Sequence, residues 1–234
     1  NEVIGVLFIN DLETSNTTSA HNNGYIYIKW NTDGSVKEFK KKYFSYQDLK
    51  STDLEEHLKK FRLNESAFDD GKGGMVAMRP RTFDTKFLKD GSVVCFSSAI
   101  GVGFKQALLN SKLIFRISNE GELDWTKFYP GDNPEYFALS NINIDETKGN
   151  IRLLSCTHKG VVSEKDATFE KNGFRFAIID RSLSLETGES DTQKYLDFPE
   201  AAGYEISNIF SGYDSFLVQF NRKTSYKICP VLVD

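Results

Sequence analysis

The strongest constraint on this sequence is a hairpin pattern that occurs twice. Segments 24–43 (GYIYIKWNTDGSVKEFKKKY) and 112–130 (KLIFRISNEGELDWTKFYP) each contain a strand, a turn with an acidic residue before glycine, and a second strand. When Gly34 is aligned with Gly121, the strand positions of the two segments correspond. An acidic residue followed by glycine favours a tight hairpin, because glycine adopts positive φ without strain. A looser third copy covers 174–188, with no glycine at the expected turn.

A second type of hairpin lies between these copies, with turns at Gly91, Gly149 and Gly212, which are 58 and 63 residues apart. One unit of about 60 residues therefore holds two hairpins and four strands. By this pattern the chain contains two complete units and a partial unit at each end. Residues 3–11 are interpreted as the end of a first-type hairpin, and residues 225–234 as the start of a second-type hairpin.

Tandem four-stranded repeats are the building units of β-propellers. The 19 Phe and 10 Tyr also favour strands, because aromatic side chains fit a pleated, half-buried surface. We therefore predict an all-β fold, a β-propeller-like array of four-stranded antiparallel blades, with a two-sheet β-sandwich as the alternative. A single domain would cover residues 1–234, either complete in itself or part of a longer chain.

The segment of about 45–70 interrupts the strand pattern and is helical in character. Leu54, Leu58 and Phe61 recur at the i, i+4, i+7 spacing of an amphipathic helix, and residues 52–55 resemble a capping box. We predict one inserted helix, which either packs on the body through its apolar stripe or acts as a lid or docking element.

Composition limits the partners and the location. The formal net charge of −4 argues against a nucleic-acid partner, and the lysines at 40–42 are interpreted as protection of an exposed strand edge.

No apolar run reaches the ~18 residues that cross a bilayer, so we expect no transmembrane segment. The chain starts at Asn1, not Met, which fits signal removal or excision from a longer chain. We expect an extracytoplasmic location: secreted, periplasmic or cell-surface.

The stretch LIFRISNEGELDW (113–125) resembles the outer hairpin of quinoprotein-like (PQQ-like) propeller repeats, in which a strand, a turn and a following Trp recur. Similar blades cover nearly the whole chain apart from residues 45 to 80. The resemblance implies a propeller fold. Because Trp125 alone supplies the tryptophan, only the fold is carried over, and we expect no cofactor.

The links between hairpins are long, whereas the turns inside hairpins are short. The long links are residues 11–23, 44–80, 98–111 and 157–172. Turns of a four-stranded meander alternate between its two ends, so the long links should share one face. Loops grouped on a rigid scaffold often carry binding, and we expect a function on that face.

The candidate ligand-binding residues lie in or beside the segments between hairpins: Tyr129, Tyr136, Phe169, His21 and His158. Aromatic side chains among Asn, Asp and Glu suit recognition of a sugar or a protein surface. The sequence has no helical zinc motif, phosphate-binding loop, dinucleotide fingerprint or nucleophile elbow. We expect no metal, and no catalytic residue can be assigned.

These observations favour a non-catalytic binding or scaffold module that presents its long loops to a protein or carbohydrate ligand. One alternative is a hydrolase or lyase with a site at the propeller axis, where carboxylates converge with His21 and His158. The other is a structural segment of a larger multidomain protein.

Overall fold

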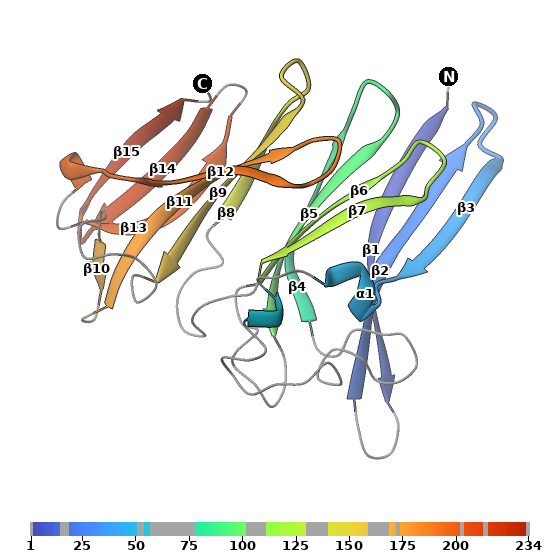
Figure 1. Ribbon diagram of the computed structural model, residues 1–234, viewed down its shortest axis with the longest axis horizontal. Helices are drawn as coiled ribbons and strands as arrows, with labels where there is room; N and C mark the ends of the chain where they lie inside the picture. Colours follow the sequence, from blue (N-terminus) through green and yellow to red (C-terminus); the bar gives the residue numbers. More distant parts are fainter. Residues whose placement is uncertain are drawn as a thin grey trace. The chain divides into compact units, whose positions relative to one another are not determined.

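The computed structural model describes residues 2–14, 19–50, 54–56, 78–101, 111–129, 140–158, 169–171, 174–201, 204–212 and 215–232 (Figure 1). By their internal contacts the residues divide into two compact units, Asn1–Pro134 (unit 1) and Glu135–Asp234 (unit 2). The prediction of one domain over residues 1–234 stays a prediction.

Unit 1 contains two antiparallel sheets, each with its strands in chain order. The first sheet consists of β1 (Val3–Thr14), β2 (Ser19–Trp30) and β3 (Val36–Tyr43). The second sheet consists of β4 (Met78–Phe87), β5 (Val93–Gly101), β6 (Ser111–Ile117) and β7 (Leu123–Tyr129).

Unit 2 also contains two antiparallel sheets. In the third sheet the order is β10-β11-β9-β8, and β12 also pairs with β11. Its strands are β8 (Ser140–Asp145), β9 (Asn150–His158), β10 (Phe169–Lys171), β11 (Phe174–Ser184) and β12 (Ser190–Leu196). The short 3-10 helix η4 (Pro199–Ala201) leads to the fourth sheet, which consists of β13 (Glu205–Ser211), β14 (Ser215–Arg222) and β15 (Ser225–Leu232).

The predicted all-β class with propeller-like antiparallel sheets is confirmed. The described residues form four separate sheets of three to five strands, as a tandem array requires, whereas a sandwich would need only two. The second sheet is a complete four-stranded meander. Three strands are described in the first sheet and three in the fourth, with β1 and β15 each at an edge.

Both terminal assignments from the sequence were wrong. Residues 3–11 belong to β1, which pairs with β2 and therefore stands before the first-type hairpin rather than at its end. Residues 225–232 form β15, which pairs with β14 as the second strand of a hairpin. The spacing of turns identified the strands, but only the pairing register shows which neighbour each strand joins.

Two further details differ from the sequence interpretation. Residues 11–23 are mostly strand rather than a long link, because β1 and β2 stay in register from Val3 opposite Trp30 to Thr14 opposite Ser19. The third hairpin copy does use a glycine: Gly188 has φ +69° and precedes β12. A longer turn moved this glycine away from the position expected from the other copies.

The inserted segment begins with helix α1 (Tyr46–Leu49) but is not one continuous helix. A capping box formed by Ser45 and Asp48 starts α1, and Lys50 ends it with extended backbone angles of φ −59° and ψ 123°. A second helical turn covers residues 54–56, where Leu54 is fully buried as its apolar spacing suggested. Thr52, Leu58 and Phe61 lie outside the described residues.

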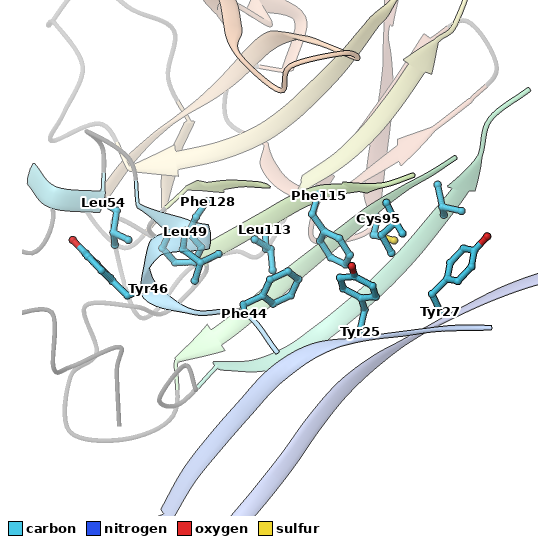
Figure 2. Close-up of a cluster of buried hydrophobic side chains, with 12 residues drawn as sticks. Tyr25, Tyr27, Phe44, Tyr46, Leu49, Leu54, Cys95, Leu113, Phe115 and Phe128 are labelled. Carbon is cyan, nitrogen blue, oxygen red and sulfur yellow. The ribbon is translucent and has the colours of Figure 1, made fainter. Parts of the chain in front are cut away.

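Each unit has a hydrophobic core between its own two sheets. In unit 1, Tyr25 and Tyr27 of β2 face Phe115 of β6, and the segment after β3 adds Phe44 and Leu49 (Figure 2). The core of unit 2 combines Leu154, Cys156 and Ile178 of the third sheet with Phe216, Val218, Phe220 and Cys229 of the fourth. Cys95, Cys156 and Cys229 are all buried, and none of the three forms a disulfide.

Candidate interaction surfaces

The structure locates four of the five residues predicted to bind a ligand. Tyr129 ends β7 and is only 6% exposed, so its side chain belongs to the interior of unit 1. His21 lies within β2, opposite Leu12, rather than in a loop.

In unit 2, Phe169 of β10 and His158 of β9 both pair with Phe176 of β11, which places them in one cross-strand row. Tyr136 lies outside the described residues, and a binding role for all five residues stays a prediction.

Exposed apolar side chains concentrate on the first and fourth sheets. Of the ten large hydrophobic side chains that are exposed in the described part of the chain, four lie on the first sheet and five on the fourth. Contiguous apolar surface of this kind marks interaction sites more often than scattered single residues do. The sequence reasoning missed these surfaces, because it assigned function to loops.

On the first sheet these side chains share the face that points away from the second sheet. Val3 pairs with Trp30, Trp30 with Val36, and Ile28 with Phe39, so the register places them on one side. We call this surface the first outer face; its residues are Val3, Leu7, Ile26, Ile28, Trp30, Val36 and Phe39. The opposite side of the same strands, with Tyr25 and Tyr27, forms the core.

The repeat gives the first outer face a counterpart within the protein. In the Gly34/Gly121 alignment, Ile28 corresponds to Phe115 and Trp30 to Ile117. The structure supports this alignment, because both hairpins shift register at the same place, next to Trp30 and next to Ile117.

Phe115 and Ile117 lie on the face of the second sheet that the first sheet covers. The first outer face therefore corresponds to a surface that is buried elsewhere in the same protein.

The fourth sheet has a similar surface, which we call the fourth outer face. Phe210 pairs with Leu217, and Leu217 pairs with Pro230, while Ile228 and Tyr226 follow at alternate positions along β15. Tyr226 is 68% exposed. The fourth outer face consists of Phe210, Leu217, Tyr226, Ile228, Pro230 and Leu232.

Polar side chains fasten the first sheet to a turn of the second. The Tyr25 hydroxyl donates to the Gly121 carbonyl (3.2 Å), and the Tyr27 hydroxyl (2.9 Å) and Lys29 ammonium (2.8 Å) donate to the Asn119 carbonyl. Burial and the nearby Glu122 carboxylate raise the pKa of the Tyr25 hydroxyl, which therefore stays a neutral donor. These contacts fix the inner side of the first sheet and leave its outer face open.

An ion pair within the third sheet holds the arginine that contacts the backbone of the fourth sheet. Arg152 and Asp180, which are 5% and 3% exposed, form a bidentate pair, and Arg152 also donates to the Leu232 carbonyl at 2.8 Å. Lys194 lies 3.5 Å from the Asp180 carboxylate. A charge pair this deeply buried needs such additional hydrogen bonds, and here they hold β15 against the third sheet.

The described residues contain no group of three or more His, Cys, Asp or Glu side chains arranged to hold a metal ion. Among the same residues, no helix has the length and hydropathy needed to cross a bilayer.

One signal in the sequence could have revealed the first outer face. Residues 25–28 (YIYI) are apolar at consecutive positions rather than alternating ones. A strand with one solvated face alternates between apolar and polar residues, whereas a strand covered on both faces is continuously apolar. β2 has the second pattern, yet among the described sheets of unit 1 only its Tyr25 and Tyr27 face packs against a neighbouring sheet.

No protein-family model matches the sequence, and no curated protein matches it. Among solved structures, the chain is similar to a GH43 β-1,3-galactosidase determined with galactodeoxynojirimycin. The TM-score is 0.40 and the sequence identity 13%, over 99% of this chain and 69% of the galactosidase chain.

Proposed function

We propose that this chain is a non-catalytic binding or scaffold module that contacts a protein partner through its outer faces. The observation that carries the proposal is the clustering of exposed apolar side chains on the first and fourth sheets, including Leu7 at 57% and Phe39 at 58% exposure. Covering such side chains removes apolar area from water, which drives most protein association.

A protein partner suits these surfaces better than a sugar does. Each outer face is a pleated sheet surface with aliphatic and aromatic side chains from at least two strands. Packing by another sheet or helix covers many such side chains at once, as the first sheet does over Phe115 and Ile117 of the second. Sugar sites usually combine an aromatic ring with several convergent polar groups.

Three expectations from the sequence form part of the same proposal: quinoprotein-like blades, an extracytoplasmic location, and further binding through the long loops. The expectation of quinoprotein-like blades is based on the β6–β7 hairpin, whose sequence resembles those repeats. In that hairpin Trp125 of β7 lies directly opposite Arg116 of β6.

Site-specific photo-crosslinking tests the proposal. A benzoylphenylalanine probe replaces Phe39 on the first outer face or Ile228 on the fourth, and in the matched control it replaces Thr32, an exposed residue of the β2–β3 turn. After irradiation in an extract of the source cells, we expect discrete adducts at position 39, position 228 or both, and none at position 32. The absence of adducts at both face positions, or identical adducts at position 32, would contradict the proposal.

A further inference from the structure

The turn between β14 and β15 has a lysine where short turns usually have glycine. Among the described residues, Lys223 is the only non-glycine residue with a positive φ (45°). It begins the two-residue turn that joins Arg222 to Ser225, the last residue of β14 and the first of β15. Such turns favour Gly, Asn or Asp at positive φ, because other side chains are strained there. Gly34 and Gly121 follow this rule in their own turns, so the lysine is kept at a cost in free energy.

The same hairpin places two more cationic side chains on one of its faces. Phe220 pairs with Lys227, and Arg222 pairs with Ser225, so these four side chains lie on one face. Phe220 is buried in the core of unit 2, whereas Arg222 and Ser225 are exposed beyond it. Arg222 and Lys227 are diagonal neighbours, a separation that long side chains can bridge. Positive charge therefore gathers at the turn end of this face.

Tyr204, which directly precedes β13, lies against this end of the hairpin. The centroid of its ring is 4.9 Å from Nζ of Lys227 and 6.0 Å from Cζ of Arg222. The Ser225 hydroxyl donates to the Tyr204 hydroxyl at 3.4 Å. Contact with the face of an aromatic ring holds a cation in place without neutralising its charge. Two cationic groups and two hydroxyl groups thus surround one ring.

The cations of this hairpin differ from those of the first sheet in their partners. Three lysines of β3 each form an ion pair with a carboxylate. Among the described residues of unit 2, the ion pairs involve other cations, and none includes Arg222, Lys223 or Lys227. Three positive charges in a chain of net charge −4 therefore stand together without a described carboxylate partner.

The acidic residues beside the hairpin are engaged elsewhere. Glu205 pairs with Asn221, which places its side chain on the opposite face of the sheet. Glu200 accepts a hydrogen bond from Lys227 through its backbone carbonyl, while its side chain is hydrogen-bonded to Cys229. A local excess of positive charge raises the concentration of anions around it.

The turn also lies at the end of unit 2 where the sequence predicted binding. Arg152, near the start of β9, donates to the carbonyl of Leu232, which lies opposite Ser215 at the start of β14. β9 and β14 therefore start at the same end, and both run toward the other end, where β9 finishes at His158 and β14 at Arg222. The link that follows β9 is one of the long links to which binding was assigned.

We propose that the turn end of the β14–β15 hairpin binds a tetrahedral oxyanion, the sulfate or phosphate group of an ester. A guanidinium such as that of Arg222 donates two parallel hydrogen bonds to two oxygens of such a group. The ammonium groups of Lys223 and Lys227 add charge, and the Ser225 hydroxyl adds a neutral donor. A sulfate or phosphate group has enough oxygens to accept from all of these donors. This site goes beyond the proposed function, because it binds a small charged group rather than an apolar partner surface.

The test is a titration of the ¹⁵N-labelled full chain followed by NMR. Sodium sulfate or sodium phosphate is added, and sodium chloride keeps the ionic strength constant. We expect saturable shifts of the amide signals of residues 222–227, with a dissociation constant of about 1–10 mM, and no such shifts with chloride alone. Saturation by only one of the two anions would identify the ester as a sulfate or as a phosphate. Shifts that do not saturate and spread over many lysines would mean an adventitious ion only, and would overturn the inference.

Three variants distinguish the site from general surface charge. Arg222→Gln should weaken anion binding about tenfold. Lys223→Asn should weaken it about threefold without lowering the urea midpoint of unfolding, because Asn tolerates a positive φ. Lys148→Asn is the matched control, an exposed lysine in the β8–β9 turn of the same unit, and should leave binding unchanged. Undiminished binding by Arg222→Gln, or equal weakening by Lys148→Asn, would contradict the site. Neither result affects the crosslinks expected at positions 39 and 228, so the proposed function is tested separately.

Discussion

At the scale of single residues, Gly121 links the turn chemistry to the packing of the sheets. Its φ of +77° suits glycine, and a Cβ at this position would lie 2.6 Å from Cδ1 of Tyr27. The glycine thus closes the β6–β7 turn and leaves room for the tyrosine whose hydroxyl holds the same turn. The sequence predicted the first role from the Glu-Gly pair, but the second depends on a contact with another sheet, which local sequence does not encode.

We predict that Gly121→Ala lowers the free energy of unfolding by about 3 kcal/mol, because it adds steric overlap to a strained φ. The matched control is Gly34→Ala, since Gly34 has a similar φ of +83° but no atom within 4 Å of the added Cβ. Its cost should be about 1 kcal/mol. Urea unfolding followed by tryptophan fluorescence measures both, because Trp30 and Trp125 both belong to unit 1. Equal costs would show that Tyr27 moves aside freely.

At the scale of elements, the hairpins and a helical insertion could be predicted from the sequence, but the end of α1 at Lys50 could not. Each hairpin is closed by residues within its own turn, such as Asp90, whose carboxylate accepts from the Ser92 amide at 2.9 Å. Such turns can be recognised locally. The inserted helix ends at Lys50, and its Leu49 is buried against residues of two sheets. Tertiary contacts therefore surround the end of α1, which the apolar periodicity of the segment did not indicate, and residues 57–70 of the predicted helix lie outside the described residues.

The start of α1 gives a prediction with a pH dependence. Partial burial alone would raise the pKa of Asp48, but hydrogen bonds from Ser45 and Lys42 outweigh it and lower that pKa. Since the folded pKa lies below the unfolded value of about 3.9, this contribution is fully present well above pH 4 and is lost as the pH falls through the folded pKa. Ser45→Ala should cost about 1 kcal/mol at pH 7 and less at about pH 2.5.

Chemical denaturation at the two pH values measures this difference. Gln47→Ala serves as the control, because Gln47 is exposed in the same helical turn and takes no part in the capping box. A cost for Ser45→Ala that stays constant from pH 7 to about pH 2.5 would contradict a role for the Asp48 carboxylate.

At the scale of the whole molecule, the number of sheets followed from turn spacing, but the candidate surfaces did not. The spacing of the turn glycines gave the number of repeats. It indicated two complete four-stranded units and a partial unit at each end. Whether a face of a strand is buried depends on the presence of a neighbouring sheet. The continuous apolar run at residues 25–28 of β2 is typical of a strand that is buried on both faces. The first outer face thus has the sequence of a buried surface but is not covered by another described sheet, and this difference motivates the proposal that a protein partner binds there.

Thiol labelling reports on how the two units unfold. Burial raises the pKa of the Cys229 thiol to about 11, and burial also raises the pKa of Cys95. Both thiols should therefore resist a disulfide reagent at pH 8 in the folded protein, since the thiolate is the reactive form. Cys156 and Cys229 share the core of unit 2, so we expect them to become reactive at one urea concentration.

Mass spectrometry of the labelled peptides resolves the three positions. Different midpoints for Cys156 and Cys229 would contradict a single core between the third and fourth sheets. Cys95, in the core of unit 1, tests the domain prediction: a midpoint shared with the other two cysteines supports one domain over residues 1–234, and a separate midpoint supports two.

The order of the strands also has a consequence for how the chain folds. Apart from β9 with β11, every described strand pair joins strands that are consecutive along the chain. Hairpins with short closed turns form in about 1–10 μs, because little chain entropy is lost when their ends meet. The sheets can therefore assemble early and separately, and the slower step is the docking of Tyr25 and Tyr27 onto a turn some 90 residues away in sequence.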